Sequence, residues 1–76
     1  MNDHEVHEEC MRLLRDGMPV PAPTAFEEGR DFLPLGLDVD GDVAVVTFLR
    51  RWEGAASAFV EGWTFHRRDG EWRELG

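Results

Sequence analysis

The chain has 76 residues, enough for one domain with a thin hydrophobic core. Domains of this size are often supported by disulfides, metals or oligomerisation, but the single cysteine, Cys10, excludes an internal disulfide. The formal net charge of −8 argues against a nucleic-acid partner, because binding to phosphates needs clustered basic side chains.

The charge is unevenly distributed along the chain. Residues 1–42 carry eleven acids and three arginines, whereas residues 43–76 carry five acids and five arginines. No apolar run approaches the roughly 20 residues that span a bilayer, and the acidic start is unlike a signal peptide. We therefore expect a cytoplasmic protein with no membrane partner.

Residues 2–16 have a helical period and predict an N-terminal helix. Asn2 or Asp3 can cap its start, and Gly17 can end it. Its apolar stripe consists of Val6, Cys10, Met11, Leu13 and Leu14. Because an isolated helix of about 15 residues is marginal, this stripe must pack on another element.

Residues 17–30 predict an extended connector, because three prolines alternate with small residues and forbid a helix or a central strand. A connector of this length can carry the chain from the end of the helix back across a sheet.

Four strands with a period of two follow within residues 31–76. Their expected ranges are 32–39, 43–52, 56–67 and 71–75. The turns between them are expected at Asp40-Gly41, at 53–55 and at Asp69-Gly70, where Asp-Gly supplies the positive φ angles of a tight hairpin. The predicted fold class is α+β, with one helix packed on a four-stranded antiparallel β-meander.

The last hairpin accounts for the arginines that lie among its aromatic residues. With Asp69-Gly70 as a two-residue loop, Arg67 faces Trp72 and Arg68 faces Glu71. Arg67 can then stack on the indole of Trp72. This predicts a structural role for these arginines.

The pairing of the second and third strands decides which side chains share a face of the sheet. We expect Leu49 opposite Phe59, and Val45 opposite Trp63. One face then consists of Leu33, Leu35, Leu37, Ala44, Val46, Phe48, Ala58, Val60, Gly62 and Leu75. The other face consists of Val43, Val45, Thr47, Leu49, Phe59, Glu61, Trp63, Phe65 and Trp72.

One helix, about 10 Å across, can cover only one face of four strands spaced about 4.8 Å apart. We expect it on the first face, where Gly62 would let it approach closely. The second face would then need a partner. The predicted interaction residues are Val45, Leu49, Phe59, Glu61, Trp63, Phe65 and Trp72. Glu61 would need an arginine from that partner, unless a one-residue change of register places it on the other face.

Two acidic segments have the composition of metal sites but lack the required spacing. The alternating Asp38, Asp40 and Asp42 surround a glycine at position four, whereas an EF-hand has glycine at position six. His4 and His7 precede Cys10 in the first helix, with no second ligand cluster in the sequence. We predict neither a metal nor another cofactor.

Catalytic residues are not predicted either. His66 and Glu61 could suggest an acid–base pair, but side chains five residues apart on a strand point to opposite faces. The chain also has no glycine-rich phosphate loop and no nucleophile elbow. We therefore expect that it is not an enzyme.

The pattern W-x-F-x-R-x-D-G-x-W, at residues 63–72, resembles the closing hairpins of NTF2-like (SnoaL-type) domains. The segments PVPAP, LGLDVDGDVAVV and EGWTFHRRDGEWRELG also resemble N-terminal parts of uncharacterised actinobacterial proteins. The first resemblance implies a curved sheet, and the second implies a bacterial chain that continues beyond Gly76.

Three functions are compatible with these patterns. The first is a protein–protein interaction or homodimerisation domain that uses the aromatic face of the sheet. The second is an acidic inhibitor or immunity-type protein whose N-terminal acids occupy a basic site, namely Glu5, Glu8, Glu9, Glu27 and Glu28. The third is an NTF2-like ligand-binding fragment with a pocket lined by Trp63, Phe65 and Glu61.

Overall fold

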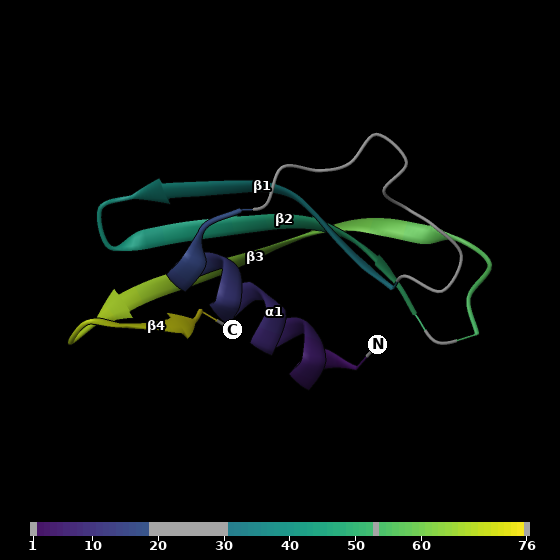
Figure 1. The fold of residues 1–76 in the computed structure, drawn as a ribbon, viewed down its shortest axis with the longest axis horizontal. Coiled ribbons are helices and arrows are strands. Elements are labelled where there is room, and N and C mark those ends of the chain that lie inside the picture. The colour runs from purple at the N-terminus through teal and green to yellow at the C-terminus, as the bar shows by residue number, and fades with distance from the viewer. Residues whose placement is uncertain (1, 19–30, 53, 76) are drawn as a thin grey trace.

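The computed structural model describes residues 2–18, 31–52 and 54–75, and it has the predicted α+β fold. One helix, α1 (Asp3–Asp16), packs against a four-stranded antiparallel sheet of order β1-β2-β3-β4 (Figure 1). The strands are β1 (Phe32–Asp40), β2 (Val43–Arg51), β3 (Ala58–Arg68) and β4 (Glu71–Glu74). Of the predicted connector, residues 19–30 lie outside the described part.

Helix α1 begins and ends where its sequence predicts. The side chain of Asn2 accepts a hydrogen bond from the backbone N–H of Glu5 at 2.9 Å, which satisfies one of the free N–H groups of the first turn. At the other end Gly17, with φ of 89°, donates its N–H to the carbonyl of Leu13 at 2.8 Å. The helix buries Val6, Cys10 and Leu13.

The two tight hairpins use different turns. Asp69 and Gly70 have φ of 55° and 80°, as expected for the predicted Asp-Gly loop. In the first hairpin Asp40 pairs with Val43, so the loop is Gly41-Asp42 and not the predicted Asp40-Gly41. Only Gly41 has a positive φ there, of 60°, which is the pattern of a turn with glycine at its first central position.

A bulge in β1 moves two leucines away from the predicted face. The register shifts between Pro34 and Gly36, so Leu35 has no partner in the ladder. Leu33 therefore pairs with Leu49 on the face away from the helix, whereas Leu37 pairs with Val46 and remains on the helix side.

The predicted register of β2 and β3 is wrong by one residue. Phe59 pairs with Arg50, and Trp63 pairs with Val46, in place of Leu49 and Val45. A shift of one residue moves every side chain of a strand to the other face. The aromatic residues of β3 therefore lie on the same side as the buried residues of β2, which are Ala44, Val46, Phe48 and Arg50.

The hydrophobic core lies between α1 and this aromatic side of the sheet. It consists of Val6, Cys10 and Leu13 from the helix and Val46, Phe48 and Phe65 from the sheet. Trp63 meets Phe48 edge to face with 5.7 Å between ring centroids, a favourable geometry for aromatic pairs. Trp72 also packs against this cluster. The β2–β3 end of the sheet reaches past the helix (Figure 1).

Gly62 lies on the face away from α1 and so does not admit the helix, contrary to expectation. A Cβ atom at this position would meet only Cγ1 of Val45, at 3.9 Å. We predict that Gly62→Ala keeps or raises the free energy of unfolding, by up to about 1 kcal/mol, because glycine weakens a strand interior.

The matched control is Gly70→Ala, which places a side chain at φ of 80° and should cost about 1 to 2 kcal/mol. Urea unfolding followed by circular dichroism compares the two variants. A Gly62→Ala variant less stable than Gly70→Ala would contradict the observed register.

Candidate interaction surface

The predicted interaction residues do not form one surface. Two of them, Val45 and Leu49, lie on the face of the sheet away from α1, and the others lie on the helix side, namely Phe59, Glu61, Trp63, Phe65 and Trp72. Phe65 has no exposed surface, and Trp63 and Trp72 pack against the core. The aromatic residues of the sheet are thus largely the support for the helix.

Arg67 and Trp72 stack as the hairpin register predicts. The guanidinium carbon of Arg67 lies 5.1 Å from the indole centroid, within the range of a cation–π contact. Arg67 also donates hydrogen bonds to Oδ1 of Asp42 at 3.2 Å and to the carbonyl of Gly41 at 3.3 Å. This arginine therefore joins two hairpins, and its role is structural.

Arg50 is a buried cation that sequence reasoning missed. Its side chain is 1% exposed, with Nη2 at 2.7 Å from Oδ1 of Asp3 and Nη1 at 3.6 Å from Oε2 of Glu61. The arginine that Glu61 needs comes from the neighbouring strand of the same chain, so no partner has to supply it. The guanidinium also lies 3.5 Å from the ring centroid of Trp52.

The histidine and cysteine side chains of α1 diverge. His4 is exposed, and His7 lies 3.6 Å from Glu74 and stacks at a tilt on Phe65. Cys10 is fully buried. Within the part of the chain that the structure describes, no group of three or more His, Cys, Asp and Glu side chains is arranged to hold a metal ion.

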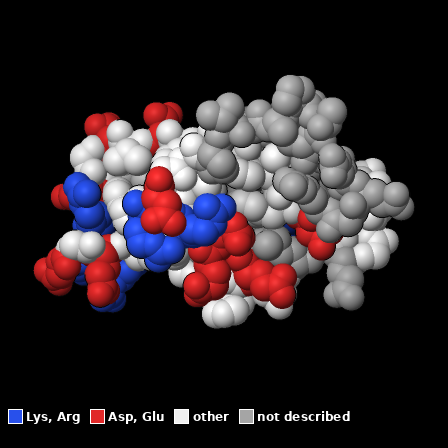
Figure 2. Space-filling model, viewed as in Figure 1, with Lys and Arg blue, Asp and Glu red and all other residues white. Residues whose placement is uncertain are grey.

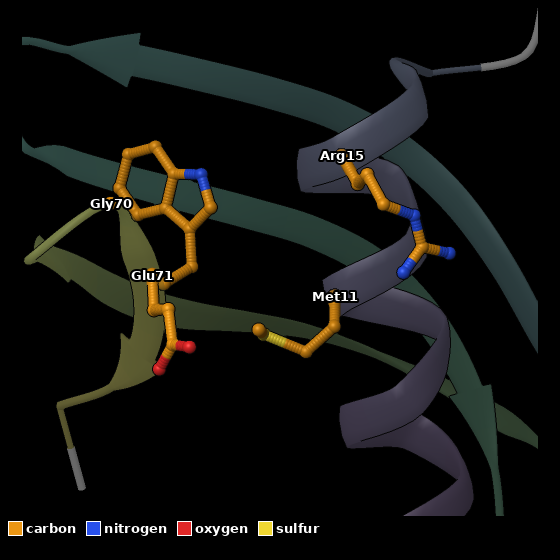
Figure 3. Close-up of a pocket in the computed structure, with 5 residues that line it drawn as sticks. Met11, Arg15, Gly70 and Glu71 are labelled. Carbon is orange, nitrogen blue, oxygen red and sulfur yellow. The ribbon is translucent and has the colours of Figure 1, made fainter.

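A groove of about 410 Å³ lies between α1 and the β3–β4 hairpin. It is lined by Met11, Arg15, Gly70, Glu71 and Trp72. Figure 3 shows Met11 reaching from α1 toward Glu71, while the guanidinium of Arg15 points away from the hairpin. The indole of Trp72 and the thioether of Met11, with the carboxylate of Glu71 beside them, could contact an apolar group of a ligand. The lining residues do not include a nucleophile paired with a base, so the groove does not resemble a catalytic site.

The NTF2-like alternative requires Trp63, Phe65 and Glu61 to line a concave pocket. Helix α1 lies over this region of the sheet, and Phe65 is completely covered. The carboxylate of Glu61 is held by Arg50. In this arrangement the three side chains support the fold and do not line an open cavity together.

The face away from α1 has an apolar centre, and it is called the uncovered face because no helix of the described residues packs on it. Its apolar and uncharged side chains on β2 and β3 include Val43 at one end, Val60 toward the other, and Val45, Thr47, Leu49, Gly62 and Thr64 between them. Val43 and Val60 are 40% and 64% exposed, and Val45 and Leu49 are half-buried between neighbouring side chains. A hollow of about 390 Å³ runs along it beside Asp38 and Val45.

Comparison with known proteins gives no match: no family model, curated protein or solved structure is significantly similar to this chain. No helix in the described residues is long and apolar enough to cross a membrane.

Burial of Cys10, together with the nearby carboxylates of Glu74, Glu9 and Glu61, raises the pKa of this thiol from 9.0 to about 12. We predict that at pH 8 a disulfide reagent labels folded Cys10 about a thousandfold more slowly than the urea-unfolded chain, because the thiolate is the reactive form. Rapid labelling of the folded chain would contradict the burial of this residue.

The free energy of unfolding should also fall as pH rises from 9.0 toward about 12, since only the unfolded thiol ionises in this range.

The ion pairs of Arg50 lead to a second prediction. Arg50→Met should lower the free energy of unfolding by about 2 to 4 kcal/mol, because Glu61 loses its charged partner at a largely buried position. The double variant Arg50→Met/Glu61→Leu should recover at least half of this loss.

Arg12→Met is the matched control, since Arg12 forms an exposed pair with Glu9 and should contribute less than about 1 kcal/mol. Chemical denaturation measures all three variants. If Arg50→Met and Arg12→Met lower the free energy of unfolding equally, the ion pairs of Arg50 contribute no more to stability than the Arg12–Glu9 pair, and the prediction is wrong.

Proposed function

We propose that this chain is a non-enzymatic protein–protein interaction domain whose contact surface is the uncovered face of the sheet. The observation that carries the proposal is that α1 covers one face only, while Val43 and Val60 remain 40% and 64% exposed on the other. Apolar patches of this kind on small domains usually mark interaction sites.

The distribution of polarity on the uncovered face supports a protein partner. Its centre is aliphatic or uncharged, with Val45 and Leu49 beside Thr47 and Thr64. Charged side chains lie toward its ends and edges, namely Asp38, Asp40, Arg51, Arg68, Glu71 and Arg73. An apolar centre with a polar rim is the usual composition of a protein interface.

The acidic-inhibitor alternative rests on the first half of α1. Asp3, Glu5 and Glu8 are exposed, and Figure 2 shows acidic side chains over the N-terminal half of the helix beside arginines over its C-terminal half. Glu27 and Glu28 lie outside the described residues. Binding through these acids would weaken steeply with salt and be lost in Glu5→Gln/Glu8→Gln, whereas binding through an aliphatic face would not.

The test uses Val43→Thr/Val45→Thr, which conserves side-chain shape and strand propensity but places two hydroxyls on the uncovered face. We expect it to weaken any association through this face, whether with a second copy or with proteins captured from cell extract, at least about tenfold while the circular dichroism spectrum is unchanged. The matched control is Val39→Thr, a 53%-exposed valine on the helix side, which should leave binding unaltered.

Sedimentation of the purified chain measures self-association, and quantitative capture with each variant as bait measures other partners. If every association survives Val43→Thr/Val45→Thr, or if all are lost in the glutamine variants, the proposal is wrong.

A further inference from the structure

Strand β3 is longer than the strand that pairs with its outer edge. It runs from Ala58 to Arg68, whereas β4 pairs only with Phe65–Arg68, and the last contact is the N–H of Leu75 with the carbonyl of Thr64 at 2.9 Å. In the described part of the chain, no strand pairs with the outer edge of residues 58–62. A hollow of about 260 Å³ lies where β4 ends, lined by Gly62, Trp63, Thr64, Glu74 and Leu75.

The hydrogen bonds on either side of β3 show which of its backbone groups face this edge. Arg67 donates its N–H toward β2, to the carbonyl of Asp42 at 2.7 Å, and Thr64 directs its carbonyl toward β4. Backbone groups alternate along a strand, and the β2–β3 register is continuous from residue 58 to residue 66. The N–H and C=O groups of Ala58, Val60 and Gly62 therefore point outward.

Residues 58–62 lack two features that usually protect an edge strand, a proline and a bulge. The segment contains no proline, and its one charged side chain, Glu61, points to the helix side and pairs with Arg50 at 3.6 Å. Phe59 and Val60 are 55% and 64% exposed, and among the other large apolar side chains of the described residues only Leu75, at 57%, exceeds the exposure of Phe59. Such an edge is a template for another extended strand.

We propose that the partner is a second copy of this chain, whose residues 58–62 pair antiparallel with the same residues of the first about a two-fold axis at Val60. Three outward-facing residues centred on Val60 are self-complementary: Val60 pairs with its own copy, and Ala58 pairs with Gly62 at both ends. This arrangement forms about six hydrogen bonds and leaves none of these outward backbone groups unpaired. Closed two-fold pairing of one surface with itself is the commonest form of homodimer.

The side chains fit the same arrangement. On the uncovered face the two Val60 side chains meet, flanked by the small residues Ala58 and Gly62, which leave room for close approach. On the helix side Phe59 of one copy lies opposite Glu61 of the other. The pairing makes the two uncovered faces continuous, so the dimer goes beyond the proposed function: it adds an interface at the edge of the sheet and leaves the face itself free for contact.

The charge of the chain sets the salt dependence. Each copy carries a formal charge of −8, so two copies repel each other through charges outside the paired segment. Added salt screens this repulsion but does not weaken apolar contacts or backbone hydrogen bonds comparably. The dimer should become tighter with salt, the opposite of binding by the acids of α1 to a basic site.

The test is Val60→Pro. Proline removes the N–H at the centre of the pairing, and it is accepted on edge strands whose N–H faces outward. We expect the wild-type chain to dimerise in sedimentation equilibrium below about 100 µM, with at least about a tenfold higher Kd for Val60→Pro. The matched control is Val60→Thr, which retains the N–H and should stay within about threefold of the wild type.

Disulfide capture gives a measurement that does not depend on proline being tolerated. Paired residues at this position would have Cα atoms about 5.5 Å apart, which a disulfide can bridge. Val60→Cys should form a covalent dimer on mild oxidation, whereas Val43→Cys, at the far end of the same face, should not. Native Cys10 is fully buried and does not compete.

A monomer at about 100 µM that yields no Val60→Cys dimer would overturn the inference. A dimer that Val60→Pro leaves intact but Val43→Thr/Val45→Thr dissociates would overturn it as well, while the proposed function would stand. If Val60→Pro does not fold, as judged by circular dichroism, the disulfide result decides.

Discussion

The register of β2 against β3 is the constraint on which the rest of the structure depends. With Phe59 opposite Arg50 and Trp63 opposite Val46, every aromatic side chain of β3 lies on the side that α1 covers. Because strand side chains alternate with a period of two, a shift of one residue would move this set into water and bury the opposite set. The core, the position of α1 and the composition of the uncovered face all follow from this pairing.

The elements with local signals could be predicted from the sequence. Helix α1 has a cap at Asn2, a stop at Gly17 and an apolar stripe, and Asp69-Gly70 specifies the last hairpin together with the contact between Arg67 and Trp72. Each of these depends on residues that are near one another in the chain. The four-stranded α+β arrangement followed from them.

The β2–β3 pairing could not be predicted because residues 52–57, which connect these strands, contain no turn motif of fixed length. The bulge near Pro34 likewise depends on packing against β2. Arg50 shows the same limit. It follows Ala44, Val46 and Phe48 at alternate positions of β2, and this alternation was the only signal in the sequence that Arg50 is buried. A charged side chain is rarely buried without a partner, and the partners of Arg50 are known only from the structure.

This register changes the kind of surface that is available to a partner. The aromatic cluster packs in the interior. Among the described residues, the remaining outer surfaces are an aliphatic face and the part of the β3 edge around Val60 with which no strand pairs. Binding to an aliphatic face depends on the shape of the partner. Binding to a strand edge depends mainly on backbone hydrogen bonds, which most side chains of the partner do not affect. The acid-rich first half of α1 lies on the other side of the sheet, and the described charged side chains of the uncovered face balance: Asp38, Asp40 and Glu71 against Arg51, Arg68 and Arg73.

Amide hydrogen exchange along β3, measured by NMR at a concentration where the chain is monomeric, tests the register most directly. The observed pairing predicts slow exchange at Phe59, Glu61 and Trp63, whose N–H groups face β2, and fast exchange at Val60 and Gly62, whose N–H groups face the open edge. The reverse alternation would mean that the strands are paired one residue away, with the aromatic residues on the uncovered face, and would contradict this account.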